Sequence, residues 1–459
     1  MRTVQGWLAE TFGGLPKTFW YLWTGTLINR LGSFVLILLA MYLTKERGFS
    51  ESQAGLALGA WGVGGAVGTM LGGVLADRWG RRPTLLTAHL GAAVLMVALG
   101  FARDLPMVIA AALLLGFFAE GTRPAFSAMM IDVVPEKDRL RAFSLNYWAI
   151  NVGFACAALL AGLAAKADYL LVFTIDAATI LITALIIFVK VREPRRAAAT
   201  ATATKSGTKS SGNMLTPLRD RAFVSFMLLN FLIAMVFLQH ISMLPIAMSD
   251  DGLSPTTFGS VIALNGVLIV LGQLFIPRLI KDRGRPQVLA LAAVITGLGF
   301  GLTAFAGSAW LYAGTVLIWT MGEMLSSPSN SSLVAELSPA ALRGRYQGVF
   351  SLSWQGASAF APVLGGLTRE HLGNSALWLG CAVVTGVAAV CYLSFGHVWE
   401  RRAAVLRSVT ATPLAPTTRA PESSTTDEEP LTAHPAPDAT LPEIAANQQP
   451  PTSRLTSVP

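Results

Sequence analysis

Residues 73–85, GVLADRWGRRPTL, form a short charged segment between two long apolar runs. One acid, three arginines, a glycine and a proline lie between Asp77 and Pro83. Glycine permits a sharp turn, and proline favours the first turn of the helix that follows. The segment therefore predicts a tight turn at a membrane surface that joins two spanning helices.

The composition supports a membrane protein with many spans. Of 459 residues, 53% are hydrophobic and 13% are charged, against about 25% charged in soluble proteins. The formal charge of +8 does not indicate nucleic acid, because the basic residues lie in loops and form no recognition motif. The three cysteines lie in apolar runs without a CxxC pair, so we expect neither a disulfide framework nor a metal site. We expect no cleaved signal peptide, because the first apolar run is too long.

Hydropathy predicts an all-α protein with twelve transmembrane helices. Each run is long enough to cross a hydrocarbon core of about 30 Å, and several are rich in Gly and Ala, which let helices approach closely in lipid. The expected spans are 19–43, 53–76, 84–102, 106–131, 143–165, 169–190, 222–247, 257–279, 287–306, 310–332, 346–368 and 376–399.

The distribution of Lys and Arg predicts the orientation. With the N-terminus inside, only Lys45, Arg47, Arg103, Lys166 and Arg369 lie in outside loops. The short loops on the other side carry an excess of basic residues, as the positive-inside rule requires. We therefore expect a multi-pass protein of the plasma membrane with both termini in the cytoplasm.

The order of apolar spans and polar stretches divides the chain into four segments. We expect two six-helix bundles at 1–190 and 221–400, joined by a flexible cytoplasmic linker at 191–220 that lacks aromatic residues. The segment 401–459 is rich in proline, lacks aromatic residues beyond Trp399, and is expected to be a disordered tail.

The two halves repeat each other. Asp132, Pro135, Arg139 and Arg141 recur 204 residues later as Glu336, Pro339, Arg343 and Arg345, and Pro124 recurs as Pro328. Asp77-Arg78 recurs as Asp282-Arg283 in a shorter copy of the turn. Such a repeat predicts two bundles related by an approximate axis along the membrane normal.

The segment 73–85 resembles the loop between helices 2 and 3 of the major facilitator superfamily of secondary transporters, whose pattern is G-x-L-x-D-R-x-G-R-R/K-x-x-L. The resemblance extends over about residues 19–399 and implies alternating access driven by an ion gradient. It also implies that the loop holds the cytoplasmic side shut when the cavity faces outward. Asp77 would then meet a helix end of the opposite half, and Arg78 and Arg81 would bridge to acids such as Asp132. The alternative is that the arginines only set topology and contact lipid phosphates. The implied gate residues are Gly73, Asp77, Arg78, Gly80, Arg81, Arg82, Asp132, Asp282, Arg283 and Glu336.

Ionisable side chains in mid-span cost on the order of 3 kcal/mol each, so they usually face a cavity. Glu120 and Arg123 lie three residues apart on one helix face and can pair. We expect Glu120, tuned by Arg123, and Glu323 in the matching helix of the second half to carry protons. A structural ion pair for Glu120 and a hydrogen-bonded structural acid for Glu323 are the alternatives.

Other polar residues in the spans are candidates for the substrate cavity. Each could instead satisfy a helix-packing contact, and we favour a structural role for Asp176. The candidates are Asn29, Arg30, Tyr147, Gln239, His240, Asn265, Asn330 and Gln355.

The direction of transport is only weakly indicated. Proton-driven exporters of the superfamily carry G-x-x-x-G-P-x-x-G-G in helix 5, but here residues 153–162 read GFACAALLAG, without the Gly-Pro pair. We expect proton-coupled export of amphipathic drugs or metabolites. Uptake of a polar nutrient such as a sugar, carboxylate or peptide is the alternative, and a non-transporting sensor that signals through its tail is a third. No catalytic, nucleotide-binding or cofactor motif occurs, and the superfamily usually works as a monomer.

Overall fold

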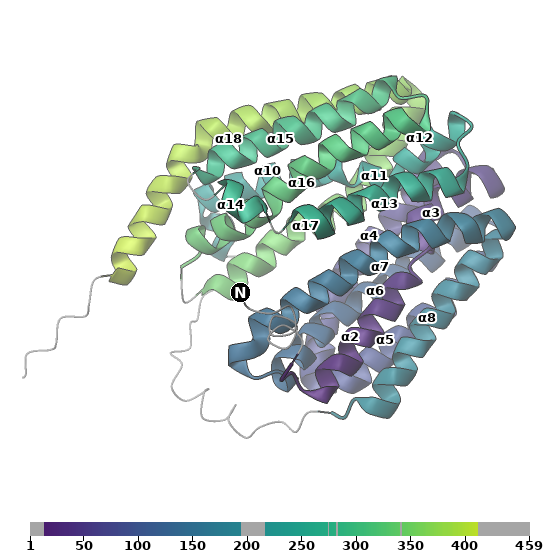
Figure 1. Cartoon of the computed structure of the whole chain (residues 1–459), viewed down its shortest axis with the longest axis horizontal. Helices are drawn as coiled ribbons and strands as arrows, with labels where there is room; N and C mark the ends of the chain where they lie inside the picture. Colours follow the sequence, from purple (N-terminus) through teal and green to yellow (C-terminus); the bar gives the residue numbers. More distant parts are fainter. Residues whose placement is uncertain (1–12, 194–215, 274, 281–282, 340–341, 412–459) are drawn as a thin grey trace, which may run out of the picture. The chain divides into compact units, whose positions relative to one another are not determined.

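The computed structural model describes residues 13–193, 216–273, 275–280, 283–339 and 342–411. Residues 13–411 belong to one compact unit. The described part consists of helices and connecting turns (Figure 1). We call residues 13–193 the first half and residues 216–411 the second half.

The first half contains six spans, of which the first is interrupted. Helices α2 (Lys17–Leu31) and α3 (Val35–Met41) are separated at Gly32, and a π-helical turn, η1 (Tyr42–Glu46), follows α3. The remaining spans of this half are α4 (Glu51–Arg78), α5 (Arg81–Phe101), α6 (Leu105–Val133), α7 (Arg139–Ala167) and α8 (Tyr169–Lys190).

The second half has the same number of spans with more interruptions. Its first span is divided into α10 (Arg221–Phe237), α11 (Gln239–Ser242) and α12 (Leu244–Asp250), and its second into α13 (Pro255–Gly272) and α14 (Ile276–Ile280). The others are α15 (Arg285–Leu302), α16 (Ala309–Leu337), α17 (Arg343–Leu372) and α18 (Asn374–Ala411).

Local sequence explains several helix starts. Ser50 and Gln53 form a capping box at the start of α4, and Ser254 caps α13 just before Pro255. Asp168 and Asp220 accept backbone N–H bonds at the starts of α8 and α10. These residues satisfy donors that a helix leaves unpaired at its beginning.

Within the described residues, ten helices are long and apolar enough to cross a membrane. α16 and α17 have 29 and 30 residues, long enough to span a membrane, but are not among these ten. Large apolar side chains such as Trp310, Phe305 and Val94 are at least 70% exposed, as expected for residues that face lipid. The twelve-helix prediction is therefore confirmed in its architecture.

Glycines allow the closest approaches between helices. A Cβ atom added to Gly64 of α4 would lie 1.8 Å from the carbonyl oxygen of Leu113 in α6, and one added to Gly68 would lie 2.0 Å from that of Phe117. Small residues thus bring the backbones of α4 and α6 into contact, the packing typical of helices in lipid.

The C-terminal boundary differs from the expectation. α18 continues to Ala411, so residues 401–411, assigned from composition to a disordered tail, are helical. Ala403 is buried, and Arg402 forms an ion pair with Asp220 at 3.2 Å. These contacts with the start of α10 explain why the helix extends beyond the apolar run. Residues 412–459 and most of the expected linker, residues 194–215, lie outside the described part.

Candidate functional site

The charged turn between α4 and α5 is held within the first half. Gly80 has a φ of 109°, a conformation that side chains disfavour, and a Cβ there would lie 2.7 Å from the carboxylate of Glu193. That carboxylate accepts the backbone N–H groups of Arg81 and Arg82 at 2.8 and 2.7 Å. Glu193, which follows α8, therefore caps α5 and fixes the turn.

The side chains of the turn contact neighbouring helices of the same half. Arg81 pairs with Asp132 at the end of α6, with Nε and Oδ2 2.9 Å apart, and lies 3.7 Å from Asp77. Arg82 donates to the carbonyl of Phe188 at 2.6 Å. A Cβ atom added to Gly73 would lie 3.7 Å from the Cβ atom of Pro124. The Arg78 side chain is exposed. The expected bond between the Arg81 and Asp132 side chains is present, whereas Arg82 contacts α8.

The second half repeats this pair at equivalent positions. Arg285 lies 3.8 Å from Glu336, which also accepts a hydrogen bond from Ser332. Arg285 and Glu336 are offset by 204 residues from Arg81 and Asp132. Arg283 is exposed, and Asp282 lies outside the described residues. Sequence reasoning missed Arg285, although its offset from Arg81 was a usable signal. The turn between α4 and α5, residues 79–80, lies at one end of the helices, and we call that end the signature end.

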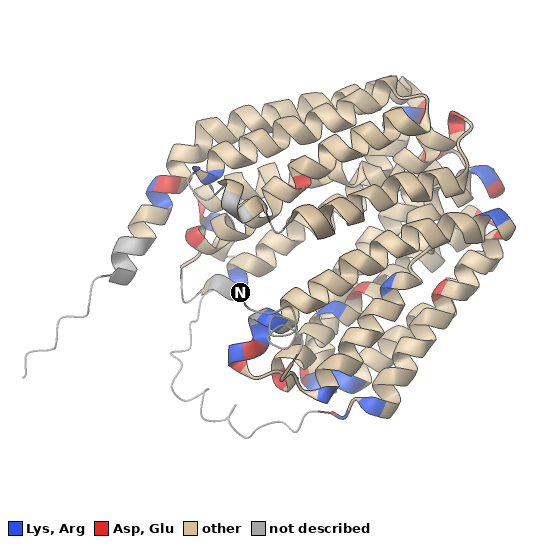
Figure 2. Cartoon of the chain, viewed as in Figure 1, with Lys and Arg blue, Asp and Glu red and all other residues tan. Residues whose placement is uncertain are grey.

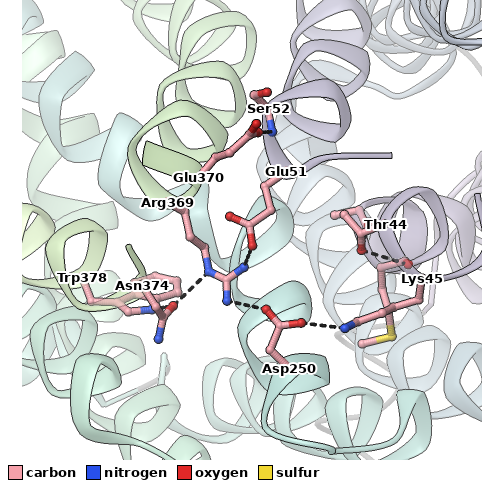
Figure 3. Close-up of polar contacts among 11 residues, drawn as sticks. Thr44, Lys45, Glu51, Ser52, Asp250, Arg369, Glu370, Asn374 and Trp378 are labelled. Carbon is pink, nitrogen blue, oxygen red and sulfur yellow. Dashed lines mark hydrogen bonds and ion pairs between the residues drawn. The ribbon is translucent and has the colours of Figure 1, made fainter. Parts of the chain in front are cut away.

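At the other end, ion pairs join the two halves (Figure 3). Arg369 of α17, only 5% exposed, pairs with Glu51 at the start of α4 and with Asp250 at the end of α12, in the latter case at 2.7 Å. Asp250 also pairs with Lys45 of η1 at 2.6 Å. Glu370 accepts the backbone N–H of Ser52 at 2.9 Å. We call this end the closed end.

The Arg369 guanidinium is oriented by its neighbours. Its Nε donates to Asn374 at 3.0 Å, and Asn374 also accepts the indole N–H of Trp378 at 2.8 Å. The three nitrogens therefore engage Glu51, Asp250 and Asn374 at once (Figure 3). A fixed fork of donors suits arginine and not lysine.

Asp250 remains charged over a wide range of pH. Partial burial alone would raise its pKa, but hydrogen bonds from Lys45 and Arg369 outweigh burial and hold the pKa below its usual value. Because the pKa is lowered in this closed state, Asp250 contributes to the stability of that state at neutral pH. The contribution is lost only as the pH falls through the lowered pKa.

Small residues complete the closed end. An added Cβ on Gly55 of α4 would lie 2.3 Å from the carbonyl oxygen of Pro362 in α17. One on Gly259 of α13 would lie 2.1 Å from that of Ala158 in α7. The second contact lies in the segment 153–162, so its Gly and Ala residues serve close packing between the halves.

A central cavity of about 200 Å³ lies between the halves, on the signature side of these contacts. Its walls come from α3, α4, α6, α11, α17 and from Leu238 between α10 and α11, and are mainly apolar. Among the described residues that line it, Glu120 and Arg123 are the ionisable ones. They form an ion pair with Nε and Oε2 2.6 Å apart. Gln355 also lines this cavity and donates to Thr69 at 3.4 Å.

A second cavity, of about 90 Å³, lies within the first half. Arg30, Asn29 and Asp176 line it together with Glu120 and Arg123, so it adjoins the central cavity at the ion pair. Asp176 is buried and accepts the backbone N–H of Val35 at 3.1 Å, where α2 gives way to α3. That contact supports the structural role expected for Asp176.

A third cavity, of about 180 Å³, lies within the second half and contains Glu323 and Asn330. Asn265 is buried beside it and donates to the Glu323 carboxylate at 2.7 Å and to Thr320 at 3.1 Å. Trp354 lines both this cavity and the central one. Figure 2 shows that most charged residues lie near the helix ends. Glu120 and Arg123 of α6 and Glu323 of α16 lie instead near the middle of their helices.

Besides Asn265, three sequence candidates do not line these cavities. Gln239 is buried and donates to the carbonyls of Met235 and Ala361, tying α11 to α17. His240 is buried, bonds to the carbonyl of Phe237 at 2.6 Å and packs against aromatic rings. Tyr147 is 49% exposed on α7. In this conformation Gln239 and His240 have packing roles.

Comparison with known proteins identifies the family. The family model described as Major Facilitator Superfamily matches residues 22–362 and 227–436, most of the chain. The chain belongs to the major facilitator superfamily. It is thus an integral membrane transporter, which confirms the resemblance of the segment 73–85, and we call that segment the signature loop.

Relatives of the chain carry different functional names. The chain is 26% identical to the uncharacterized MFS-type transporter YttB of Bacillus subtilis over 379 residues, 81% of this chain and 93% of that protein. It is 26% identical to the Na(+), Li(+), K(+)/H(+) antiporter of Planococcus maritimus, with 79% and 92% covered. It is also 26% identical to the multidrug resistance protein MdtH of Salmonella arizonae, with 73% and 82% covered.

Solved structures of other transporters share the fold. A POT family transporter in complex with 5-aminolevulinic acid matches with a TM-score of 0.70 and 14% identity, over 84% of this chain and 97% of that one. The D-xylose-proton symporter matches with a TM-score of 0.67 and 16% identity, over 82% and 97%. At such identity the likeness concerns the fold alone.

Proposed function

We propose that this superfamily member is a secondary active transporter that exports amphipathic drugs or metabolites in exchange for protons. The central cavity carries this proposal: its walls are mainly apolar, and its charge is confined to the Glu120–Arg123 pair. Such walls suit a large apolar cargo, and few polar groups are available to order a sugar. Relatives named as a multidrug resistance protein and a cation/proton antiporter are consistent with proton-linked export.

In this proposal the carboxylates of Glu120 and Glu323 bind and release protons as the cavity changes its access. Each lies in its own half at a cavity wall, and Arg123 is 58% exposed, so it can leave Glu120 when that carboxylate is protonated. Proton binding that depends on a movable counter-ion couples the proton to conformation.

The two ends of the transporter act as alternating gates. At the closed end, Arg369 links Glu51 to Asp250 across the halves, whereas the Arg81–Asp132 and Arg285–Glu336 pairs at the signature end each stay within one half. The excess of Lys and Arg in the signature-end loops supports a cytoplasmic location for that end. The structure then corresponds to a state closed to the exterior, in a plasma membrane protein with both termini inside.

The decisive experiment uses purified protein in liposomes that contain a pH-sensitive dye, under an imposed proton gradient. Lipophilic amines, neutral antibiotics, sugars, small peptides and Na⁺ or K⁺ are added in turn. Proton movement opposite to an amphipathic compound is the expected result. Co-movement with a nutrient would make the protein an uptake symporter, and a response to Na⁺ or K⁺ alone would make it a cation exchanger.

Glu120→Gln and Glu323→Gln are expected to lower proton-driven flux by at least tenfold while leaving gradient-free exchange of substrate measurable. Gln keeps the shape and the hydrogen-bond acceptor but cannot release a proton. Glu400→Gln, an exposed site on α18, is the matched control and should retain full flux. Undiminished pH-gradient-driven flux in both test variants would exclude these carboxylates as proton carriers.

Arg81→Ala is expected to weaken closure of the signature end. Arg81 joins the turn after α4 to Asp132 of α6, and it also donates to the carbonyl of Ala76. Its removal loosens the surface that must close against the second half. Labelling of a cysteine at Ser358, which lines the central cavity, should rise severalfold from the signature side under a gradient. Arg401→Ala is the control, and equal labelling of Arg81→Ala and wild type would contradict this gate.

A further inference from the structure

A wide cavity of about 820 Å³ lies at the closed end, where α7 of the first half meets the start of α13 in the second half. It is larger than the central cavity, which has about 200 Å³. The first half contributes Lys45, Glu46, Lys166 and Tyr169 to its wall, and the second half contributes five hydroxyl side chains between residues 249 and 260. A free ion or a few water molecules, at about 30 Å³ each, would fill little of this space.

Two opposite charges in this cavity lack a partner. Glu46 and Lys166 are exposed, and neither forms an ion pair or a hydrogen bond among the described residues. Lys45 also lines the cavity, but Asp250 already pairs with its ammonium at 2.6 Å (Figure 3). One anion and one cation therefore face the same space unpaired. A ligand that carries both signs of charge complements such a wall better than a simple anion does.

Neutral side chains supply the hydrogen-bonding groups that such a ligand needs. The hydroxyl of Tyr169 forms no hydrogen bond among the described residues, so it can donate to a phosphate oxygen. Thr256 donates to the carbonyl of Gly162 at 3.0 Å, and Ser260 donates to the carbonyl of Thr256 at 2.9 Å. Each of these two hydroxyls has used its one proton, so its oxygen lone pairs remain to face a cationic amine.

The exposed faces of α7 and α13 beyond the cavity are apolar. Leu159, Leu163 and Lys166 follow one another at spacings of four and three, so they lie on one face of α7. The two leucines are 43% and 56% exposed. On α13, Val267 and Leu271 lie two and three turns beyond the last residue of the cavity and are 44% and 64% exposed. These faces lead from the polar cavity along the spans, the direction in which acyl chains extend.

We propose that this cavity binds the zwitterionic headgroup of a phospholipid from the leaflet at the closed end. Lys166 and Tyr169 hold the phosphate, Glu46 faces the cationic amine, and the acyl chains lie along α7 and α13. Both halves line the cavity, and the bond from Thr256 to Gly162 joins them there. A lipid that contacts both halves in this state favours the closed end over its open form. Its binding depends neither on the transported solute nor on protons.

Native mass spectrometry of the detergent-solubilised full chain tests the binding. The probes are palmitoyl-oleoyl phosphatidylethanolamine and phosphatidylcholine, which are zwitterionic, and phosphatidylglycerol, which has the phosphate but no amine. We expect wild type to bind the two zwitterionic lipids about fivefold more tightly than phosphatidylglycerol. Glu46→Gln should remove this preference, and Lys166→Gln should weaken all three lipids. Arg103→Gln and Asp104→Asn, at exposed sites between α5 and α6 at the same end, are the matched controls and should bind like wild type.

Three results would overturn the lipid site. They are equal affinity of wild type for all three lipids, unchanged binding in both variants, and binding of soluble phosphoethanolamine as tight as that of the lipid. The last result would show that the acyl chains contribute nothing and that the cavity takes a soluble ligand.

Labelling in vesicles tests whether the lipid holds the halves together. The chain carries a cysteine at Ser358 in place of its native cysteines, and an impermeant thiol reagent is added at the closed end. In vesicles of phosphatidylethanolamine and phosphatidylcholine, Glu46→Gln and Lys166→Gln should label severalfold faster than wild type. In vesicles of phosphatidylglycerol alone, this difference should disappear. Faster labelling of the variants in both kinds of vesicle, or in neither, would refute a lipid that stabilises the closed end.

Discussion

Replacing Arg369 with Gln is expected to open the closed end and to shift the protein towards the state that faces the other side. Arg369 is almost fully buried and joins Glu51, Asp250 and Asn374. Without it, two carboxylates from opposite halves lose their shared cation. Breaking a buried pair costs on the order of 3 kcal/mol, which corresponds to a roughly hundredfold change in the ratio of closed to open molecules.

The measurement is the labelling of a cysteine at Ser358 by an impermeant thiol reagent added at the closed end, with Cys156, Cys381 and Cys391 replaced by Ala. Arg369→Gln should label far faster than wild type, and Arg369→Lys should fall between them because one ammonium cannot reproduce three directed bonds. Arg103→Gln, an exposed arginine in the loop between α5 and α6 at the same end, is the matched control. Equal labelling in Arg369→Gln and wild type would show that this network does not hold the gate.

Gly259→Leu is expected to prevent the closed end from forming and to reduce transport by about tenfold to a hundredfold, given the cost of overpacking a tight contact. A Cβ at Gly259 would lie 2.1 Å from the carbonyl oxygen of Ala158 in the other half. That oxygen belongs to the backbone of α7, so it cannot move aside without separating the helices. The clash is absent when the halves part, so the protein should still fold.

Flux in liposomes and thermal unfolding together test the glycine. Gly380→Leu in α18 is the matched control, because a Cβ there meets nothing within 4 Å. We expect Gly259→Leu to lose flux while keeping an unfolding temperature near that of wild type, and Gly380→Leu to keep both. Flux above half of the wild-type value in Gly259→Leu would mean that α7 and α13 need not approach so closely.

Local features of the sequence predicted the framework well. Long apolar runs, the turn at 73–85 and the 204-residue repeat predicted the number of helices, the superfamily and the ion pair between Arg81 and Asp132. These features depend on the transfer of short segments into lipid and on turn chemistry, both of which act over a few residues. Interruptions such as that at Gly32 and the extension of α18 to Ala411 depend on neighbouring helices, so hydropathy alone missed them.

Only the tertiary structure decided which charges form the gate. Arg369 meets Glu51 across 318 positions and Asp250 across 119, and Lys45 meets Asp250 across 205. From sequence, Lys45 and Arg369 were merely outside-loop cations. Packing likewise made Gln239 a link between helices and left Glu323 facing an open cavity. The partners of a polar side chain depend on which helices meet in a given conformation, and no local pattern encodes that. By contrast, the free-energy cost of exposing an apolar segment to water is a sum over its own residues, so the sequence alone reveals it.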